Sequence, residues 1–192
     1  MSQHPEHRFR RQSWPYPDVE LRAGNLVLTR FDPDRDTEPL FRALDDPAVW
    51  SHLPTPRPRT IEELRALLLT SIQSHNCQTW VIRLGGEVVG TSSHYHEQET
   101  PQGVEIGSTY LAPSVWGTGV NDRSKALMID AARRAGAQWI DLRTDERNAR
   151  SEAAILKLGA QPNGTWIESS LRPDGTRLIS KLFRLRLDEQ TD

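Results

Sequence analysis

The segment from Val104 to Arg143 constrains the fold more than any other part of the chain. Val104–Leu111 has the composition of a strand, and so has the shorter run Trp139–Arg143. A loop that contains glycines and a helix expected at about Asn121–Arg134 lie between them. Two strands joined through a helix lie parallel in one sheet. The chain is therefore expected to form a sheet with at least one parallel pair.

The strands before this segment are joined too tightly to be parallel. Thr79–Leu84 and Glu87–His94 are separated by two glycines, which is typical of a tight antiparallel hairpin. Further strands are expected at Asn25–Phe31, Thr165–Leu171 and Leu178–Leu187, and further helices at Asp34–Asp45, after the cap residue Thr60, and at Asn148–Leu158. The predicted fold class is α/β, with a mixed, mainly antiparallel sheet flanked by helices.

Length and composition fit one globular domain with short tails. Of the 192 residues, 36% are hydrophobic and 26% are charged, a balance typical of soluble domains. We assign residues 21–187 to a single domain, residues 1–20 to a polar N-terminal arm and residues 188–192 to an acidic tail.

Charge and hydropathy argue against several classes of function. A net charge of −2 provides no bulk attraction for nucleic acid. No apolar run has the length of a membrane span, and the first residues lack the apolar core of a signal peptide, so we expect a cytoplasmic protein. No metal is expected, because His94 and His96 share a strand face without a third ligand nearby.

The loop from Tyr110 to Asn121 has the features of an anion site. Gly117 and Gly119 permit positive φ angles and a close approach of a ligand to the main chain, at the positive end of the following helix. A dinucleotide-binding loop would need a third glycine where Asp122 stands. The Gly-Lys-Ser/Thr sequence of a P-loop is also absent.

Arg123 is a second indication of an anion near this loop. A cation in the first turn of a helix faces the unfavourable end of the helix dipole, and a bound anion would reverse that penalty. An ion pair with Asp122, or an arginine that faces solvent, remains the alternative.

Several short motifs in order along the chain resemble one known family. They are Glu105-Ile106-Gly107, Trp116-Gly117-Thr118-Gly119-Val120-Asn121, Lys125, Asp145, Arg147-Asn148-x-x-Ser151, Leu158-Gly159 and Leu171-Arg172-Pro173-Asp174-Gly175. This set is similar to the N-acetyltransferases of the GNAT superfamily, and in particular to the RimJ/RimL-like branch. The resemblance extends from about Leu21 to Leu187. Ser114 departs from the family's usual arginine or glutamine, and Arg123 from its usual glutamate.

The resemblance implies an enzyme that moves an acetyl group from acetyl-coenzyme A to a primary amine. The acceptor would be a protein N-terminus, such as that of a ribosomal protein, or a small amine, and a homodimer is implied as an option. The family's central strands splay apart to hold the pantetheine. The implied coenzyme-binding residues are Leu111, Trp116, Gly117, Thr118, Gly119, Val120, Asn121, Arg123, Asn148 and Ser151.

Two residues are candidates for the chemistry. Glu105 alternates with Val104 and Ile106 on the strand before the loop, so it is expected to face the cleft as a general base. Its alternative role is that of a cross-strand partner for an arginine. Many members of the family carry a tyrosine acid where Ile155 stands, so Ser151 is the substitute candidate. Hydrogen bonding to Asn148 is the alternative role of Ser151, and a protein that binds coenzyme A without efficient catalysis is the alternative function.

Overall fold

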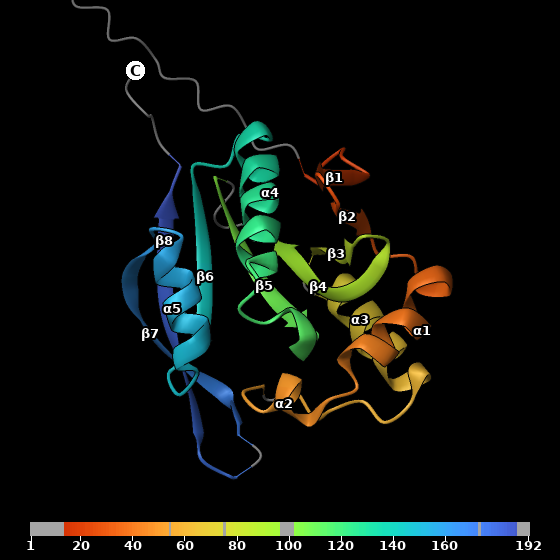
Figure 1. Cartoon of the computed structure of the whole chain (residues 1–192). Coiled ribbons are helices and arrows are strands. Elements are labelled where there is room, and N and C mark those ends of the chain that lie inside the picture. The colour runs from red at the N-terminus through yellow and green to blue at the C-terminus, as the bar shows by residue number, and fades with distance from the viewer. Residues whose placement is uncertain (1–13, 54, 75, 97–101, 173, 188–192) are drawn as a thin grey trace, which may run out of the picture.

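A single twisted sheet forms the centre of the protein (Figure 1). The computed structural model describes residues 14–53, 55–74, 76–96, 102–172 and 174–187. The sheet has eight strands in the order β1-β2-β3-β4-β5-β6-β8-β7. The strands are β1 (Glu20–Ala23), β2 (Leu26–Arg30), β3 (Cys77–Leu84), β4 (Glu87–Tyr95), β5 (Gly103–Leu111), β6 (Trp139–Asp145), β7 (Gln161–Leu171) and β8 (Arg177–Arg186). Only β5 and β6 pair in parallel among these strands, which confirms the predicted fold class.

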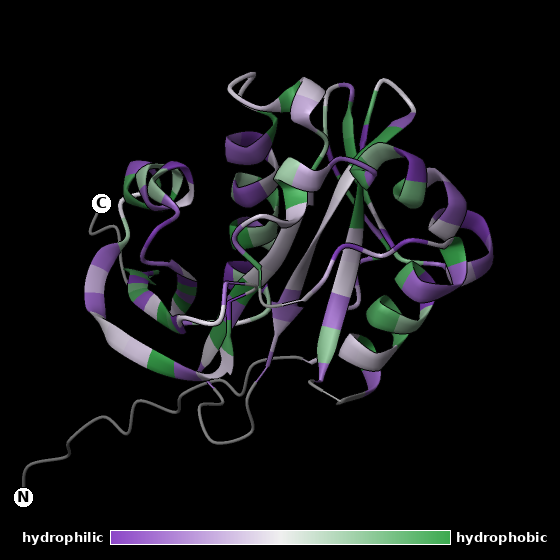
Figure 2. Ribbon diagram, turned by 90° about the horizontal axis from the view of Figure 1, so that it is seen from below, coloured by the Kyte–Doolittle hydropathy of each residue, from purple (hydrophilic) through white to green (hydrophobic). Residues whose placement is uncertain are grey.

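Helices cover both faces of this sheet (Figure 2). They are α1 (Pro33–Leu44), α2 (Pro47–Trp50), α3 (Ile61–Ser74), α4 (Val120–Arg134) and α5 (Ala149–Lys157), with a short 3-10 turn, η1 (Pro113–Val115). One core cluster contains Leu40, Leu44, Leu64 and Leu68 from α1 and α3. The other contains Met128, Ile129, Ala131, Ala132 and Ile155 from α4 and α5. None of the described helices is long and apolar enough to cross a membrane.

The central strands β5 and β6 separate soon after they pair. Their register covers Gly103–Glu105 on β5 and Trp139–Asp141 on β6, although both strands continue well beyond these residues. On its other edge, β5 pairs with β4 through a bulge, where the register shifts between Thr91 and Ser93. Ser108 lies in this bulge with a φ angle of 44°, in the left-handed region. The predicted splay of the central strands is confirmed.

Three features of the fold were not predicted correctly. The strand β1 and the short helix α2 were missed, because four residues are too few for a periodic pattern. Tyr16 belongs to the segment assigned to the N-terminal arm, yet its side chain is fully buried and packs against His94. The domain core therefore begins before residue 21, whereas residues 1–13 and 188–192 lie outside the described residues.

We expect Tyr16→Ala to lower the free energy of unfolding by about 3–5 kcal/mol, because it empties a fully buried aromatic site. Val19→Ala is the matched control, since Val19 is 71% exposed and its truncation should change stability by less than about 0.5 kcal/mol. Chemical denaturation of the three proteins measures both values. Equal stability of the Tyr16 variant and the wild type would show that the segment around Tyr16 belongs to the N-terminal arm and not to the domain core.

Candidate active site in the splay of the sheet

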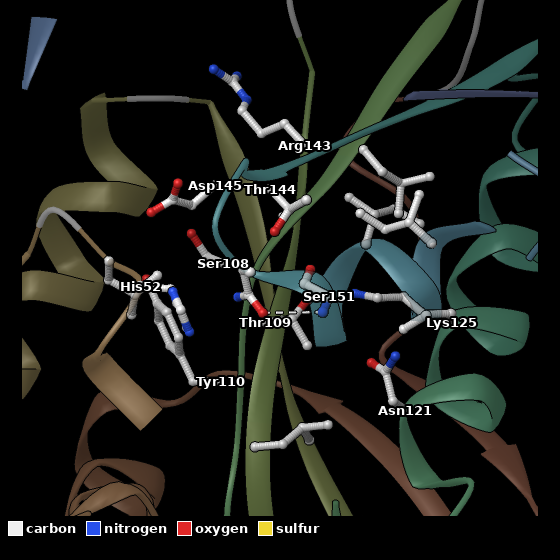
Figure 3. Close-up of a pocket in the computed structure, with 18 of the residues that line it drawn as sticks. His52, Ser108, Thr109, Tyr110, Asn121, Lys125, Arg143, Thr144, Asp145 and Ser151 are labelled. Atoms are coloured by element: carbon white, nitrogen blue, oxygen red, sulfur yellow. Dashed lines mark hydrogen bonds between the residues drawn. The ribbon is translucent and has the colours of Figure 1, made fainter. Parts of the chain in front are cut away.

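A cavity of about 1360 Å³ opens where β5 and β6 separate. Figure 3 shows residues of both strands along it, with Ser108, Thr109 and Tyr110 on β5 and Thr144 and Asp145 on β6. Residues of α2, α3 and the segment after α2 line it on one side of the sheet, among them Val49, His52, Leu67 and Ser71. The glycine loop, α4 and α5 line it on the other side, among them Trp116, Asn121, Lys125, Ser151 and Ile155. The cavity therefore reaches both faces of the sheet.

The glycine loop has the backbone conformation expected of an anion site. The φ angles of Gly117 and Gly119 are 73° and 83°, a region that other residues rarely adopt. A Cβ atom at either position would meet nothing within 4 Å, so space alone does not require glycine here. Gly119 is the N-cap of α4, and no side chain of the described residues caps this helix. The first amides of α4 thus remain available to a ligand.

The remaining loop residues support this conformation. The indole Nε1 of Trp116 donates to the carbonyl of Leu111 at 2.9 Å, and the hydroxyl of Thr118 donates to the carbonyl of Val115 at 2.7 Å. Val120 is 2% exposed and packs in the core. Among the expected coenzyme residues, Leu111, Trp116, Gly117, Gly119, Asn121, Asn148 and Ser151 line the cavity.

Three expected coenzyme residues do not line the cavity: Thr118, Val120 and Arg123. Arg123 contacts the turn between β1 and β2 instead. Its guanidinium donates to the carbonyl of Ala23 at 2.9 Å and to the side-chain oxygen of Asn25 at 3.2 Å. It therefore holds the turn between β1 and β2 and does not line the cavity. The expectation of an anion beside Arg123 was based on the helix dipole alone, and the two neutral acceptors offset that penalty instead.

Asn148 and Ser151 meet at the start of α5. The side-chain oxygen of Asn148 accepts a hydrogen bond from the backbone N–H of Ser151 at 3.1 Å, so Asn148 is the N-cap of this helix. Both residues line the cavity. Ile155 lies one turn further along α5, is 5% exposed and also lines the cavity, so an apolar side chain occupies the place of the tyrosine acid.

A contact that was not predicted from the sequence joins α5 to the glycine loop. The guanidinium carbon of Arg150 lies 3.6 Å from the centroid of the Trp116 ring, in the geometry of a cation–π pair. Close by, the Lys157 amine and the Asp122 carboxylate form an ion pair at 2.5 Å. All four residues line the cavity. The spacing Asn148-x-Arg150-Ser151 was visible in the sequence, but nothing in it linked Arg150 to a tryptophan 34 positions earlier.

Glu105 faces the opposite end of the cavity and is paired with an arginine. Arg143 on β6 donates to both carboxylate oxygens of Glu105, with Nε at 2.9 Å and 3.1 Å and Nη2 at 2.5 Å. The Nη1 atom of Arg143 also lies 3.6 Å from the Oε1 atom of Glu168 on β7. The cross-strand pair considered as an alternative for Glu105 is thus present. The side chains of Glu105 and Glu168 are 17% and 21% exposed, so ligands can reach both carboxylates.

A buried ion pair holds the end of β6 to the hairpin of β7 and β8. The Arg172 guanidinium donates to both oxygens of Asp145, at 2.9 Å and 2.6 Å. This hydrogen bonding lowers the pKa of the Asp145 carboxyl from its ordinary value, because it stabilises the charged form. Asp145 is one of the motif residues that resemble the family. In the structure it lines the cavity beside Thr144, and its ion pair with Arg172 holds this part of the wall in place.

His94 is a structural residue in this arrangement. Its Nδ1 accepts from the indole of Trp80 at 2.9 Å, and its Nε2 lies 3.1 Å from the carbonyl oxygen of Met128. These two partners fix the neutral tautomer with the proton on Nε2. Burial lowers the pKa of His94 to about 3, so the ring stays uncharged near neutral pH.

Several solved structures with a similar fold are described as acetyltransferases. The chain has a TM-score of 0.84 with a probable acetyltransferase of the GNAT family from Chromobacterium violaceum, at 23% identity over 97% of this chain and 95% of that one. The ribosomal L7/L12 alpha-N-protein acetyltransferase RimL, in complex with coenzyme A, gives 0.74 at 18% identity over 88% and 98%. A Salmonella typhimurium protein solved with its cofactor acetyl-CoA gives 0.64 at 20% identity over 88% and 97%.

A family model supports the same assignment at the level of sequence. No curated protein matches the chain. The model for the acetyltransferase (GNAT) domain matches residues 25–161, which include the glycine loop, Glu105 and Ser151 and make up more than half of the chain. The chain belongs to the GNAT acetyltransferase family.

Proposed function

We propose that this protein transfers the acetyl group of acetyl-coenzyme A to a primary amine by direct attack within a ternary complex. The observation that carries the proposal is the cavity that passes through the splay of β5 and β6. It joins a loop suited to phosphates on one face of the sheet to a group of carboxylates on the other. A thioester and an amine could therefore meet in the middle of the sheet, and such placement supplies much of the rate of a two-substrate reaction.

The coenzyme is assigned to the side of α4 and α5. Its pyrophosphate would lie against the amides of Gly117, Gly119 and the first turn of α4. The pantetheine would continue along β5 beyond the bulge, where the strand has no partner in β6, and add to the sheet as an extended segment does. Asn148 and Ser151 would contact it from the start of α5. The backbone amides of the bulge would stabilise the negative charge that develops on the carbonyl oxygen.

The amine is assigned to the side of Glu105 and Glu168. Carboxylates that line a cavity favour the approach of an ammonium group. Glu105 is the proposed base, which removes a proton as the amine nitrogen attacks the carbonyl carbon. Ser151 is proposed to donate a hydrogen bond to the departing sulfur. His52 also lines the cavity, near enough to Asp145 to interact electrostatically, and would provide a polar contact for the acceptor (Figure 3).

The class of amine that accepts the acetyl group is a separate, more specific proposal. We infer a RimJ/RimL-like enzyme that acts on a protein N-terminus or on a small amine. The motifs around Trp116 and Asn148 support this inference, as does the likeness in fold to RimL. A homodimer and a cytoplasmic location stay predictions.

Release of free thiol from acetyl-coenzyme A tests the proposal, with a panel of short peptides and small amines as acceptors. We expect thiol release that depends on the amine, together with a matching acetylated product by mass spectrometry. Binding of coenzyme A without amine-dependent release would instead support the alternative, a binding or sensing protein. Ser114 and Ile155, which depart from the usual motifs, are compatible with that alternative.

We expect Gly119→Glu to abolish the binding of coenzyme A, because the new carboxylate repels phosphate at the start of α4. Gly119→Ala is the matched control, since it introduces the strain of a positive φ angle, about 1–2 kcal/mol, without a charge. Isothermal titration calorimetry on both folded variants separates strain from repulsion. If Gly119→Glu binds coenzyme A with wild-type affinity, the phosphates do not bind at this loop.

Arg150 lies over Trp116 of the glycine loop and lines the cavity, so we propose that its guanidinium also binds the phosphates of coenzyme A. Arg150→Ala should then weaken the binding of coenzyme A by about tenfold or more, because a charged hydrogen bond to phosphate contributes about 1.5–3 kcal/mol. The affinity for pantetheine, which lacks the phosphates, should not change. Arg133→Ala is the control, since Arg133 is exposed in the last turn of α4 and does not line the cavity. Equal losses for coenzyme A and pantetheine would limit Arg150 to holding Trp116 in place.

Glu105→Gln should lower turnover by about 10²–10⁴-fold and leave coenzyme binding unchanged, because a general base contributes that much. Its rate should recover partly as the pH rises, since more of the amine is then unprotonated. Arg143→Met is the comparison, because it breaks the same ion pair and keeps the carboxylate. If Glu105 is only a partner for Arg143, the two variants should lose activity and stability equally.

A further inference from the structure

Lys125 is a buried amine that the mechanism above does not use. It extends from α4 toward the bulge of β5 and lines the cavity. Its Nζ donates to the hydroxyl of Ser92 on β4 at 2.9 Å and to the hydroxyl of Thr109 on β5 at 2.5 Å. Only 5% of the residue is exposed. Figure 3 shows the amine pointing from α4 into the cavity, toward Ser151.

No described carboxylate forms an ion pair with Lys125. The other lysines of the chain, Lys157 and Lys181, pair with Asp122 at 2.5 Å and with Glu152 at 2.8 Å. The carboxylates that line the cavity are each paired with another cation: Glu105 with Arg143, Glu168 with Arg143, Asp122 with Lys157 and Asp145 with Arg172. Burial of an ammonium without a counter-ion is costly, so this position needs a reason beyond stability.

The surroundings of Lys125 bring the pKa of its amine close to neutral pH, so that the charged and neutral forms are both populated. Burial lowers the pKa of Lys125 to about 7, since desolvation disfavours the ammonium. His94 on β4 is near enough to interact electrostatically with Lys125, but it stays neutral. The other charged residues of α5 and of the glycine loop that line the cavity are Arg150, Asp122 and Lys157. An anion that arrives in the cavity would favour the charged form of Lys125.

We propose that Lys125 pairs with the sulfur of the coenzyme and protonates it as the thiolate leaves. The proposal rests on the function proposed above, because it assigns the thioester to the splay between β5 and β6. A sulfur beside the β5 bulge would lie next to Thr109, to which the amine is already bound. The place of the usual tyrosine acid holds Ile155, so the cavity has no phenol there. Ser151 can donate a hydrogen bond to the sulfur, but Lys125 can give it a proton.

The proton and electron balance of this step closes within the ternary complex. The amine nitrogen forms a bond to the carbonyl carbon, and the carbon–sulfur bond breaks with its electron pair on sulfur. The sulfur takes a proton from the Lys125 ammonium, and the amine loses one proton to Glu105. Solvent then returns a proton from Glu105 to Lys125. While both groups are held in the cavity, pairing with the thiolate favours the ammonium form of Lys125. Without an anion beside it the pKa of Lys125 is about 7, so as the product leaves the amine can give this proton to the sulfur, whose thiol has an ordinary pKa of about 8.5.

The alternative role of Lys125 is structural, with its amine stabilising the bulge of β5 through the hydrogen bonds to Ser92 and Thr109. Loss of the amine would leave Ser92 and Thr109 bonded to each other, because their hydroxyl oxygens lie 2.8 Å apart. Methionine has a similar length and no charge, so Lys125→Met should fold. Lys181→Met is the matched control, since Lys181 is on β8 and does not line the cavity.

Calorimetry with coenzyme A and desulfo-coenzyme A separates these roles without an acceptor. The wild type and Lys181→Met should bind coenzyme A about tenfold more tightly than its desulfo analogue, because a charged hydrogen bond to sulfur is lost in the analogue. Lys125→Met should bind the two equally. Equal preference for coenzyme A in Lys125→Met and the wild type would overturn the proposal. Failure of the wild type to bind either ligand would instead overturn the proposed function.

The ionisation of bound coenzyme A is a second measurement that needs no variant. Thiolate absorbance of the wild-type complex, minus that of the free protein, should show the bound thiol ionising well below its ordinary value of about 8.5. In Lys125→Met it should return to that value. A bound thiol that ionises in the wild type as it does in free solution would overturn the proposal, even if Lys125→Met failed to fold.

Discussion

The loss of pairing between β5 and β6 is the constraint on which the site depends. After Glu105 and Asp141 the two strands no longer share hydrogen bonds, although both remain in the middle of an eight-stranded sheet. Unpaired backbone groups in such a position cost free energy unless another partner satisfies them. A bound extended segment would supply that partner. The cavity, the bulge at Ser108 and the glycine loop all lie around this gap, so the fold prepares one place for a ligand that behaves like a strand.

The bulge itself needs support, and polar side chains provide it from both faces of the sheet. Tyr95 of β4 and Ser108 of the bulge form a hydroxyl hydrogen bond of 2.5 Å on the side of α3. Ser92, Thr109 and Lys125 form a second group on the side of α4. Because every member of these groups has a partner, the left-handed conformation of Ser108 is held without an unsatisfied buried hydroxyl. The strained residue lies at the point where the thioester is proposed to react.

Much of the fold could be predicted from local patterns, whereas most pairings across the site could not. Gly85-Gly86 predicted a hairpin, and the strands on either side of α4 predicted the parallel pair, because both patterns depend on neighbours in the sequence. The Glu105–Arg143 ion pair was only an open alternative, since it joins residues 38 positions apart. No local sequence pattern indicated that Arg150 lies over the Trp116 ring. None indicated that Tyr16 is buried in the core either. Arg123 shows the opposite error, because the dipole rule applied but the β1–β2 turn supplied the acceptors.

In the proposed reaction, the charges around the cavity divide it into three parts with different tasks. Arg150, with the amides of the glycine loop, makes one end attractive to phosphate, while Glu105 and Glu168 make the other end attractive to an ammonium. Ion pairs join the carboxylates of both ends to arginine or lysine side chains. Lys125 lies between these ends, buried and with hydroxyl partners alone among the described residues. In the proposed reaction the proton given to sulfur therefore comes from this central amine, while the proton of the acceptor goes to Glu105 at one end of the cavity.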